Sequence, residues 1–400
     1  MRPIPDPPAE RLWHLEGVRG LACIQVVTLH AAGCFLPGLV EGPAPAWMLA
    51  IRQSPLRLLY DGDLAVFLFF VLSGHVLAAP FRRAAGNPGG LLAGRLVRFA
   101  VPVLLAVSLG FAVARAAPNL AREAGALLGA GWLNGGLPAA TLAGALRDAL
   151  LNALVLGYRD LSALSPWLGD AIAPATDSLD PPLWTLSVEM QGSLLVLGLT
   201  QIERRAPGLL KGIIALTALL TLRSPLLCFL AGYLCAGPRS IRLPRLTLAA
   251  TALAAYLGAE PLAEWCTTHA LPMLPALAPG LLLRGWVAIL IFPLLLHGPT
   301  LRRWLAAAPW RRAGALSFPL YLVHWPVMFG PGAAALLTIA PSLGPNAAGA
   351  LAALSAILLA LALAVPFARI DRAALELGRQ IRETWPGQEI FNAAAQSRAR

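Results

Sequence analysis

Apolar and polar positions alternate along the chain in long blocks, and the apolar blocks have the length of membrane-spanning helices. An apolar segment of about 17 to 25 residues crosses a bilayer as an α-helix. The pattern predicts about ten such spans, at residues 15–36, 61–81, 96–116, 183–202, 207–222, 224–237, 245–260, 280–298, 314–337 and 346–368. The predicted fold class is therefore all-α, a polytopic membrane protein with a bundle of about ten transmembrane helices.

The basic residues between the spans indicate the orientation of the bundle. Lys and Arg collect on the cytoplasmic side of membrane proteins. If the N-terminus is cytoplasmic, most of the basic side chains fall in cytoplasmic loops, as in the pairs Arg82–Arg83 and Arg302–Arg303. We therefore expect both termini in the cytoplasm.

Two segments lie outside this regular pattern. Residues 117–182 form one long outer connection that contains either no crossing or two, because a single crossing would invert every later loop. Residues 1–368 are expected to form the integral membrane domain, and residues 369–400 a cytoplasmic amphipathic or flexible tail. The tail carries one apolar face, which predicts a helix on the inner membrane surface; that face consists of Ile370, Ala373, Ala374, Leu377 and Ile381.

Composition supports the membrane assignment and excludes other classes. The chain has 400 residues, of which 58% are hydrophobic and 13% are charged, whereas about 25% of residues are charged in soluble domains. Its formal net charge of +11 is spread over small clusters, so no nucleic-acid partner is expected. The five cysteines form no CxxC pair and are interpreted as small apolar residues, with no metal site and no disulfide framework.

The first span carries a polar stripe that lipid alone would not tolerate. Arg19 and His30 are eleven residues apart, about three helical turns or roughly 16 Å along one face. Glu16 shares this face. Ionisable residues in a span usually face protein or a water-filled path. The stripe is either a structural Glu16–Arg19 pair with a packed histidine, or the wall of an active channel in which imidazole exchanges a proton near neutral pH.

Two further motifs place polar residues in or beside the second and third spans. FFVLSG places Ser73 deep in the span, where a small residue also allows close helix packing. RLVR places Arg95 and Arg98 one turn apart at a predicted cytoplasmic helix start. These arginines are either topology anchors or a fork for phosphate groups.

The fourth and ninth spans carry the remaining candidates. PPLWTLSVE follows Asp180 and contains Trp184 and the intramembrane carboxylate Glu189. SFPLYLVHWP contains Tyr321 and His324, for which structural and functional roles are both open.

In this order the motifs resemble those of membrane-bound acyltransferase family 3, which O-acylates cell-surface glycans and some secreted small molecules. The resemblance rests on LEGVRG with LHA, FFVLSG, RLVR, PPLWTLSVE and SFPLYLVHWP, and covers nearly the whole chain. It implies a helical bundle, a cytoplasmic acyl-CoA donor and an acceptor hydroxyl reached from outside. One position departs from many members, because Phe67 stands where they have aspartate two residues before the Phe-Phe pair.

The resemblance and the residues together assign candidate roles. His30 is expected to be the catalytic residue, with Arg19 as its partner in the motif and Glu189 as a third candidate. The candidate residues for binding acyl-CoA are Arg95, Arg98 and Ser73. Candidates for lining the channel or the acceptor site are Glu16, Asp180, Trp184, Tyr321 and His324.

The expected function is a bacterial inner-membrane O-acyltransferase, with acetyl-CoA as the expected donor substrate and no tightly bound cofactor. The expected acceptor is an extracytoplasmic or lipid-linked glycan, such as an exopolysaccharide or cellulose. Membrane lipid and a polysaccharide synthase or export complex are the other expected partners.

The alternative is a proton-coupled transporter or glycan exporter in which Arg19, His30, Glu189 and His324 form an ion relay. No paired inverted halves of the kind common in transporters are visible in the sequence. A non-catalytic anchor for a synthase would leave the intramembrane charges unexplained.

Overall fold

The computed structural model describes residues 12–83, 87–129, 131–159, 161–162, 164–237, 245–269 and 277–385. These residues form helices and connecting turns, with no strand among them. The α-helices are α1 (Trp13–Phe35), α2 (Ala46–Arg52), α3 (Gly62–Arg83), α4 (Pro88–Ala116), α5 (Leu120–Leu128), α6 (Leu142–Arg147), α7 (Ser165–Leu168), α8 (Trp184–Arg205), α9 (Leu210–Thr221), α10 (Leu226–Cys235), α11 (Arg245–Gly258), α12 (Glu260–His269), α13 (Pro279–His297), α14 (Pro299–Leu305), α15 (Ala308–Val327), α16 (Ala333–Leu343) and α17 (Pro345–Thr384). The other helical turns are η1 (Pro37–Leu39), η2 (Pro55–Tyr60), η3 (Trp132–Gly135), η4 (Asp148–Leu156), η5 (Gly169–Ala171), η6 (Ala175–Asp177), η7 (Pro181–Leu183), η8 (Pro207–Leu209) and η9 (Met328–Gly332).

Each of the ten predicted spans coincides with helical structure, and the helical fold class is confirmed. Within the described residues, six helices are long and apolar enough to cross a membrane: α1, α3, α4, α13, the continuous Ala308–Leu343 segment and α17. Helices α9 and α10 are apolar but shorter. The chain is therefore a multi-helix membrane protein, while ten crossings and cytoplasmic termini remain predictions.

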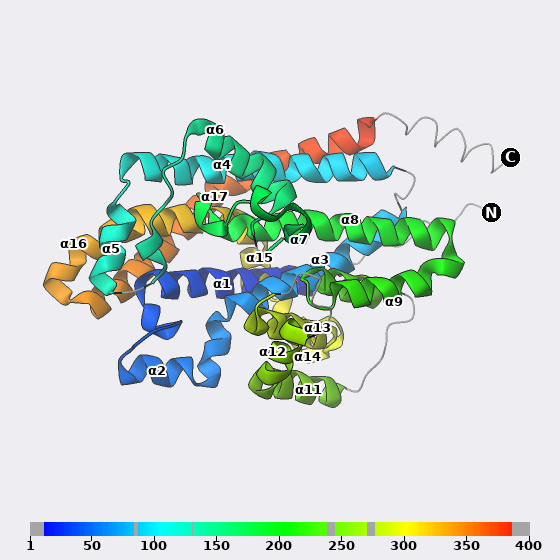
Figure 1. Ribbon diagram of the computed structural model, residues 1–400, viewed down its shortest axis with the longest axis horizontal. Coiled ribbons are helices and arrows are strands. Elements are labelled where there is room, and N and C mark those ends of the chain that lie inside the picture. Colours follow the sequence, from blue (N-terminus) through cyan, green and yellow to red (C-terminus); the bar gives the residue numbers. More distant parts are fainter. Residues whose placement is uncertain are drawn as a thin grey trace.

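Helices α1 and α15 pack closely and run parallel at the centre of the bundle (Figure 1). Glycines allow this approach, because a methyl group at Gly20 would lie 2.6 Å from the backbone nitrogen of Gly314. One turn further along, the thiol of Cys23 lies 3.1 Å from the carbonyl oxygen of Ser317. The same offset of 294 residues joins Cys23 to Ser317 and His30 to His324.

Helix α17 runs beside α4, and the two form the edge of the bundle seen at the top of Figure 1. They meet at Gly94 and Gly378, where a side chain on either glycine would collide with the other backbone. The 40 residues of α17 span about 60 Å, twice the hydrocarbon thickness of a bilayer.

The part of α17 beyond Ile370 belongs to the segment for which the sequence predicts a surface helix. The helix continues without a break to Thr384, and Ala374 and Gly378 are buried. Of the predicted apolar face, Ala373 and Leu377 remain exposed, so a position of this face on the membrane surface stays a prediction. Residues 386–400 of the expected tail lie outside the described part of the chain.

Polar contacts join the helix ends at both ends of the bundle. At the end that we name the inner end, Arg82 lies 2.8 Å from Glu203, and Asn87 donates to the carbonyl of Arg382. At the opposite, outer end, the buried carboxylate of Asp61 accepts from Arg284 at 3.1 Å and from Tyr256 at 3.0 Å. The helix ends predicted to share the cytoplasmic side therefore meet at one end of the bundle.

The long connection at residues 117–182 folds into short helices at the outer end. Helices α5, α6, η4 and α7 lie here, and none of them is long enough to be among the candidate membrane spans. A buried network closes the segment, since Tyr158 donates to Asp148 at 2.6 Å and Ser178 donates to the same carboxylate at 3.0 Å. The connection thus forms an ordered cap, which places Trp132 against α1.

Candidate active site

His30 on α1 and His324 on α15 form a hydrogen-bonded pair. The Nδ1 atom of His30 lies 2.6 Å from the Nε2 atom of His324, and the two rings are nearly coplanar, with an interplanar angle of 3°. On its other side, the Nδ1 atom of His324 lies 2.5 Å from the carbonyl oxygen of Tyr321. Figure 1 labels both helices that carry the pair, α1 and α15, near the centre of the molecule.

The backbone carbonyl fixes the proton positions in this pair. A carbonyl oxygen only accepts, so the Nδ1 atom of His324 carries a hydrogen and donates it to Tyr321. In the neutral imidazole the Nε2 atom of His324 is then an acceptor, and the Nδ1 atom of His30 must donate to it. The lone pair of neutral His30 is therefore on its Nε2 atom, the nitrogen that points away from His324.

Two tryptophans enclose the pair. Trp132 from the outer cap and Trp325 from α15 present their rings edge-on to His30, with centroid distances of 5.4 and 5.3 Å. His324 is fully buried, whereas His30 is only half-buried. The indole nitrogen of Trp325 is buried and has no hydrogen-bond partner among the described residues.

A cavity of about 530 Å³ lies between the histidine pair and the inner end of the bundle. It is named here the arginine cavity, because five arginines and three carboxylates line it: Arg19, Arg95, Arg98, Arg311, Arg372, Glu16, Glu189 and Asp371. Arg19 pairs with Glu16 at 3.2 Å, and Arg95 pairs with Glu189. Positive charge therefore exceeds negative charge in its wall.

Two guanidinium groups in the arginine cavity keep unused donors. The Nε atoms of Arg95 and Arg98 are buried and have no hydrogen-bond partner among the described residues. Both groups lie over the ring of Phe99, at 5.1 and 5.6 Å from its centroid. Buried donors without partners are uncommon in native proteins, so an anionic ligand would satisfy groups that the chain leaves unsatisfied.

Tyr321 separates the arginine cavity from the histidine pair. Its hydroxyl donates to the carbonyl of Pro182 and accepts from the hydroxyl of Thr185 at 2.7 Å. Val26 and Tyr321 line the cavity, and they precede His30 and His324 by about one helical turn, or roughly 5 to 6 Å. A ligand in the cavity would therefore reach within one turn of the pair at the Tyr321–Thr185 contact.

The structure brings most of the predicted site residues together. Seven of them line the arginine cavity: Glu16, Arg19, Ser73, Arg95, Arg98, Glu189 and Tyr321. Glu189 contacts Arg95 and is not a partner of His30. Trp184 lies outside the cavity lining and packs edge-on against Phe70, with a centroid distance of 6.0 Å.

Asp180 also lies outside the cavity lining and is fully buried. Neither of its carboxyl oxygens has a hydrogen-bond partner among the described residues. Burial, and secondly the nearby carboxylate of Asp148, raises the pKa of Asp180 well above its ordinary value. The position favours a protonated, neutral side chain.

Some lining residues were not among the sequence candidates. Asp371 and Arg372 fall in the predicted tail, and Arg311 lies outside the motifs that supply the candidates. Thr185, which lines the cavity, and Trp325, which contacts His30, each directly follow a candidate, Trp184 and His324. Their place inside the quoted motifs was the available signal. Consecutive residues of a helix point about 100° apart, so a neighbouring candidate does not by itself predict their contacts.

Comparison with known proteins identifies the class of this helical bundle. The family model described as an acyltransferase domain matches residues 12–369, nearly the whole chain. The chain belongs to acyltransferase family 3. Searches of curated proteins and of solved structures gave no match. The protein is therefore a membrane acyltransferase.

Proposed function

We propose that the protein is an O-acyltransferase that moves an acyl group, most simply acetyl, from cytoplasmic acyl-CoA to a hydroxyl of an outer or lipid-linked glycan. The observation that carries this proposal is the position of the histidine pair, one turn above a cavity with unsatisfied arginine donors. The donor thioester and the acceptor hydroxyl would meet at His30.

The tautomer of the pair supports a basic role for His30. Its Nε2 atom takes the proton of the acceptor hydroxyl while the oxygen attacks the thioester carbonyl carbon. The tetrahedral intermediate then breaks its carbon–sulfur bond, and the leaving sulfur receives the proton, which gives the ester and free CoA thiol. In the other route open to this geometry, Nε2 attacks the thioester carbonyl carbon first, the carbon–sulfur bond breaks and CoA leaves as a thiolate. The acceptor hydroxyl then attacks the acyl group on Nε2, which releases the imidazole, and the hydroxyl proton passes to the CoA thiolate. In both routes His324 accepts from Nδ1 of His30 and stabilises its positive charge.

The arginine cavity supports acyl-CoA as the donor. The nucleotide and phosphates of CoA are too polar to cross hydrocarbon, so they would remain at the inner end near Arg95 and Arg98. The uncharged thioester arm would extend along the cavity toward Tyr321. If the contact between Tyr321 and Thr185 breaks, the thioester can pass the remaining helical turn between the arginine cavity and His30.

The acceptor would arrive from the outer end, where Trp132 and Trp325 flank His30. Aromatic rings and a half-buried histidine suit a sugar, which presents apolar faces between its hydroxyls. A polysaccharide synthase or exporter in the bacterial inner membrane would supply such an acceptor.

Mass spectrometry of surface glycans from cells with and without the gene tests the proposal. Loss of an acetyl ester in the deletion strain, restored by the wild-type gene but not by His30→Asn, is the expected result. Ester content that is unchanged in the deletion strain would refute a glycan acceptor. A transporter instead predicts pH-dependent flux in vesicles without release of CoA thiol from acetyl-CoA.

A further inference from the structure

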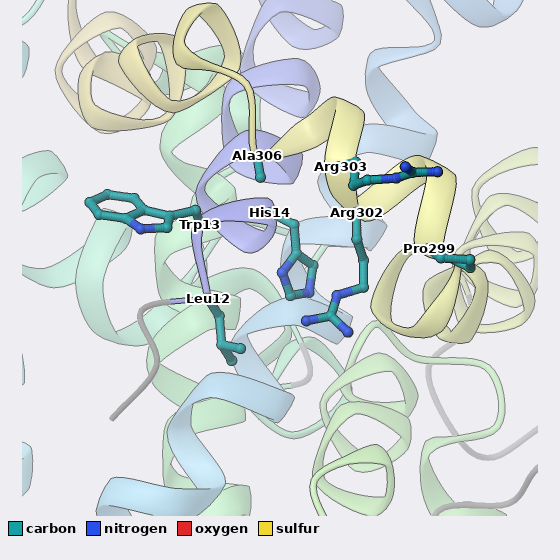
Figure 2. A pocket seen from close by; sticks show the side chains of 7 residues that line it. All are labelled: Leu12, Trp13, His14, Pro299, Arg302, Arg303 and Ala306. Atoms are coloured by element: carbon teal, nitrogen blue, oxygen red, sulfur yellow. The ribbon is translucent and has the colours of Figure 1, made fainter. Parts of the chain in front are cut away.

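A second cavity, of about 550 Å³, lies at the inner end of the bundle between the start of α1 and helix α14. Trp13 and His14 from α1 and Arg302, Arg303 and Ala306 from the α14 region line it (Figure 2). It is named here the α14 cavity. Trp13 also lines the arginine cavity, so the two cavities share this residue.

His14 leaves a polar atom unsatisfied in this cavity. The residue is 4% exposed, and its Nε2 atom has no hydrogen-bond partner among the described residues. In Figure 2 the side chains of His14 and Arg302 extend in the same direction, toward Leu12, whereas Arg303 extends away from them. A buried polar atom without a partner is costly. A guanidinium only donates, so Arg302 cannot accept from His14 when Nε2 carries the hydrogen, whereas an anion can accept from both side chains.

The charge in the α14 cavity is not balanced. No Asp or Glu is among the described residues that line it, and neither Arg302 nor Arg303 forms an ion pair with a carboxylate in the described part of the chain. The arginine cavity differs, because Arg19 and Arg95 both have carboxylate partners there. The described residues of the α14 cavity therefore supply no anion that could accept hydrogen bonds from an imidazole and a guanidinium together.

The surroundings of the α14 cavity point to the membrane surface as the source of this anion. Leu12, Trp13 and Trp304 are exposed apolar residues beside it, with Trp304 47% exposed. Tryptophans of this kind concentrate at the level of lipid headgroups, and basic pockets between helices on the cytoplasmic side bind anionic headgroups. Arginine matches the geometry of a phosphate group better than lysine does.

We propose that the α14 cavity is a phosphate-binding site, which an anionic phospholipid of the inner leaflet fills with its headgroup. His14 and Arg302 hold the phosphate, and the acyl chains lie along the exposed Leu12 and Trp13. Because Trp13 is shared with the arginine cavity, a bound lipid steadies the end of α1 that carries Arg19. This site is separate from the acyl-transfer chemistry, so its test does not depend on the proposed function.

Lipid-dependent thermal stability of the purified full-length protein in neutral detergent tests the proposal. Short-chain phosphatidylglycerol should raise the Tm, whereas phosphatidylcholine of the same chain length should not. Arg302→Gln should weaken the apparent affinity for phosphatidylglycerol by about tenfold or more, the loss of one charge-assisted contact. Arg312→Gln is the matched control, since Arg312 is an exposed arginine at the same end that lines neither cavity.

Three outcomes would overturn the lipid assignment. Equal stabilisation by phosphatidylglycerol and by zwitterionic phosphatidylcholine would show that the headgroup needs no net negative charge, which would refute an anionic phospholipid as the occupant. If Arg302→Gln and Arg312→Gln lose the same affinity for phosphatidylglycerol, the binding depends only on the net charge of this end of the protein and not on a site. Stabilisation by inorganic phosphate or CoA but not by phosphatidylglycerol, again lost in Arg302→Gln, would assign the site to a soluble phosphate.

His14→Gln provides a second variant with a different readout. Gln retains a donor but is not an imidazole, so the protein should fold and show weaker phosphatidylglycerol binding by native mass spectrometry. His30→Asn should bind phosphatidylglycerol like the wild type, which separates this site from the histidine pair. Unchanged lipid binding in both His14→Gln and Arg302→Gln would refute the site.

Discussion

The Nδ1 atom of His30 lies 2.6 Å from the Nε2 atom of His324, although the two residues are 294 positions apart in the chain. The contact depends on the parallel packing of α1 and α15 through Gly20 and Gly314. The carbonyl of Tyr321 orients His324, and His324 in turn accepts from Nδ1 of His30. The free lone pair of neutral His30 is therefore on its Nε2 atom. In the proposed function, His324 would therefore act on the reaction through His30, as a positioning residue.

His30→Asn should insert and fold but lose most acyl transfer. Asparagine keeps hydrogen bonding but cannot take a proton near neutral pH, and general acid–base help is worth about 10²- to 10⁴-fold in rate. Release of CoA thiol from acetyl-CoA in proteoliposomes measures the loss. His269→Asn, at an exposed histidine on α12, should retain wild-type rates. A His30→Asn protein with wild-type turnover would exclude the catalytic role.

His324→Asn should reduce kcat while leaving the affinity for CoA unchanged, because the side chain is outside the lining of the arginine cavity. If His324 works only through His30, the two variants will not be additive. We expect the double variant His30→Asn/His324→Asn to be no slower than His30→Asn alone. Additive losses in this double-mutant cycle would indicate that His324 has its own role in the chemistry.

The sequence predicts where the helices lie along the chain more successfully than which helices contact one another. Apolar periodicity located helices at all ten predicted spans, because the bilayer imposes length and apolarity on each span separately. Glu16 and Arg19 of the polar stripe line a cavity and also pair with each other, so features of both open interpretations are present. These properties depend on short stretches of chain.

Contacts between distant helices depend on packing that short stretches do not encode. Arg95 and Glu189 were assigned to different roles from the sequence, yet they pair with each other across α4 and α8. The segment after Ile370 packs against α4 where Gly94 meets Gly378, and the apolar face read from the sequence does not predict this contact. In both cases the missing information was which helix lies opposite.

The ion pair between Arg95 and Glu189 gives a further prediction. Their side chains are only 10% and 13% exposed, so Glu189→Gln leaves a buried charge unpaired and should cost about 3 to 5 kcal/mol of stability. Replacing both, as Arg95→Met/Glu189→Leu, should recover most of the Tm but not CoA binding. Thermal unfolding and isothermal titration with CoA measure the two effects. Full CoA affinity in the double variant would remove Arg95 from the donor site.

Cysteine labelling of intact cells checks the orientation of the bundle. With the native cysteines replaced, Glu41→Cys near η1 should react with an impermeant maleimide from outside. Ala307→Cys, between α14 and α15, should react only after permeabilisation. Both positions are exposed in the structure, so a lack of reaction reports the side of the membrane. Labelling of Ala307→Cys in intact cells would reverse the predicted orientation.

Asp180 should make the stability of the outer cap depend on pH. Its pKa in the folded protein is raised above the ordinary value, which is about 3.9 in an unfolded chain. The stabilisation from its neutral form is therefore complete below about pH 4 and is lost as pH rises through the folded-state pKa. Asp180→Asn mimics the neutral acid, so its Tm should fall less than that of the wild type as pH increases from about 5 to 9. Asp177→Asn, at an exposed neighbour, should keep the wild-type slope. If Asp180→Asn keeps the same slope as well, the titrating group lies elsewhere and the buried carboxyl at position 180 stays ionised despite its lack of a partner.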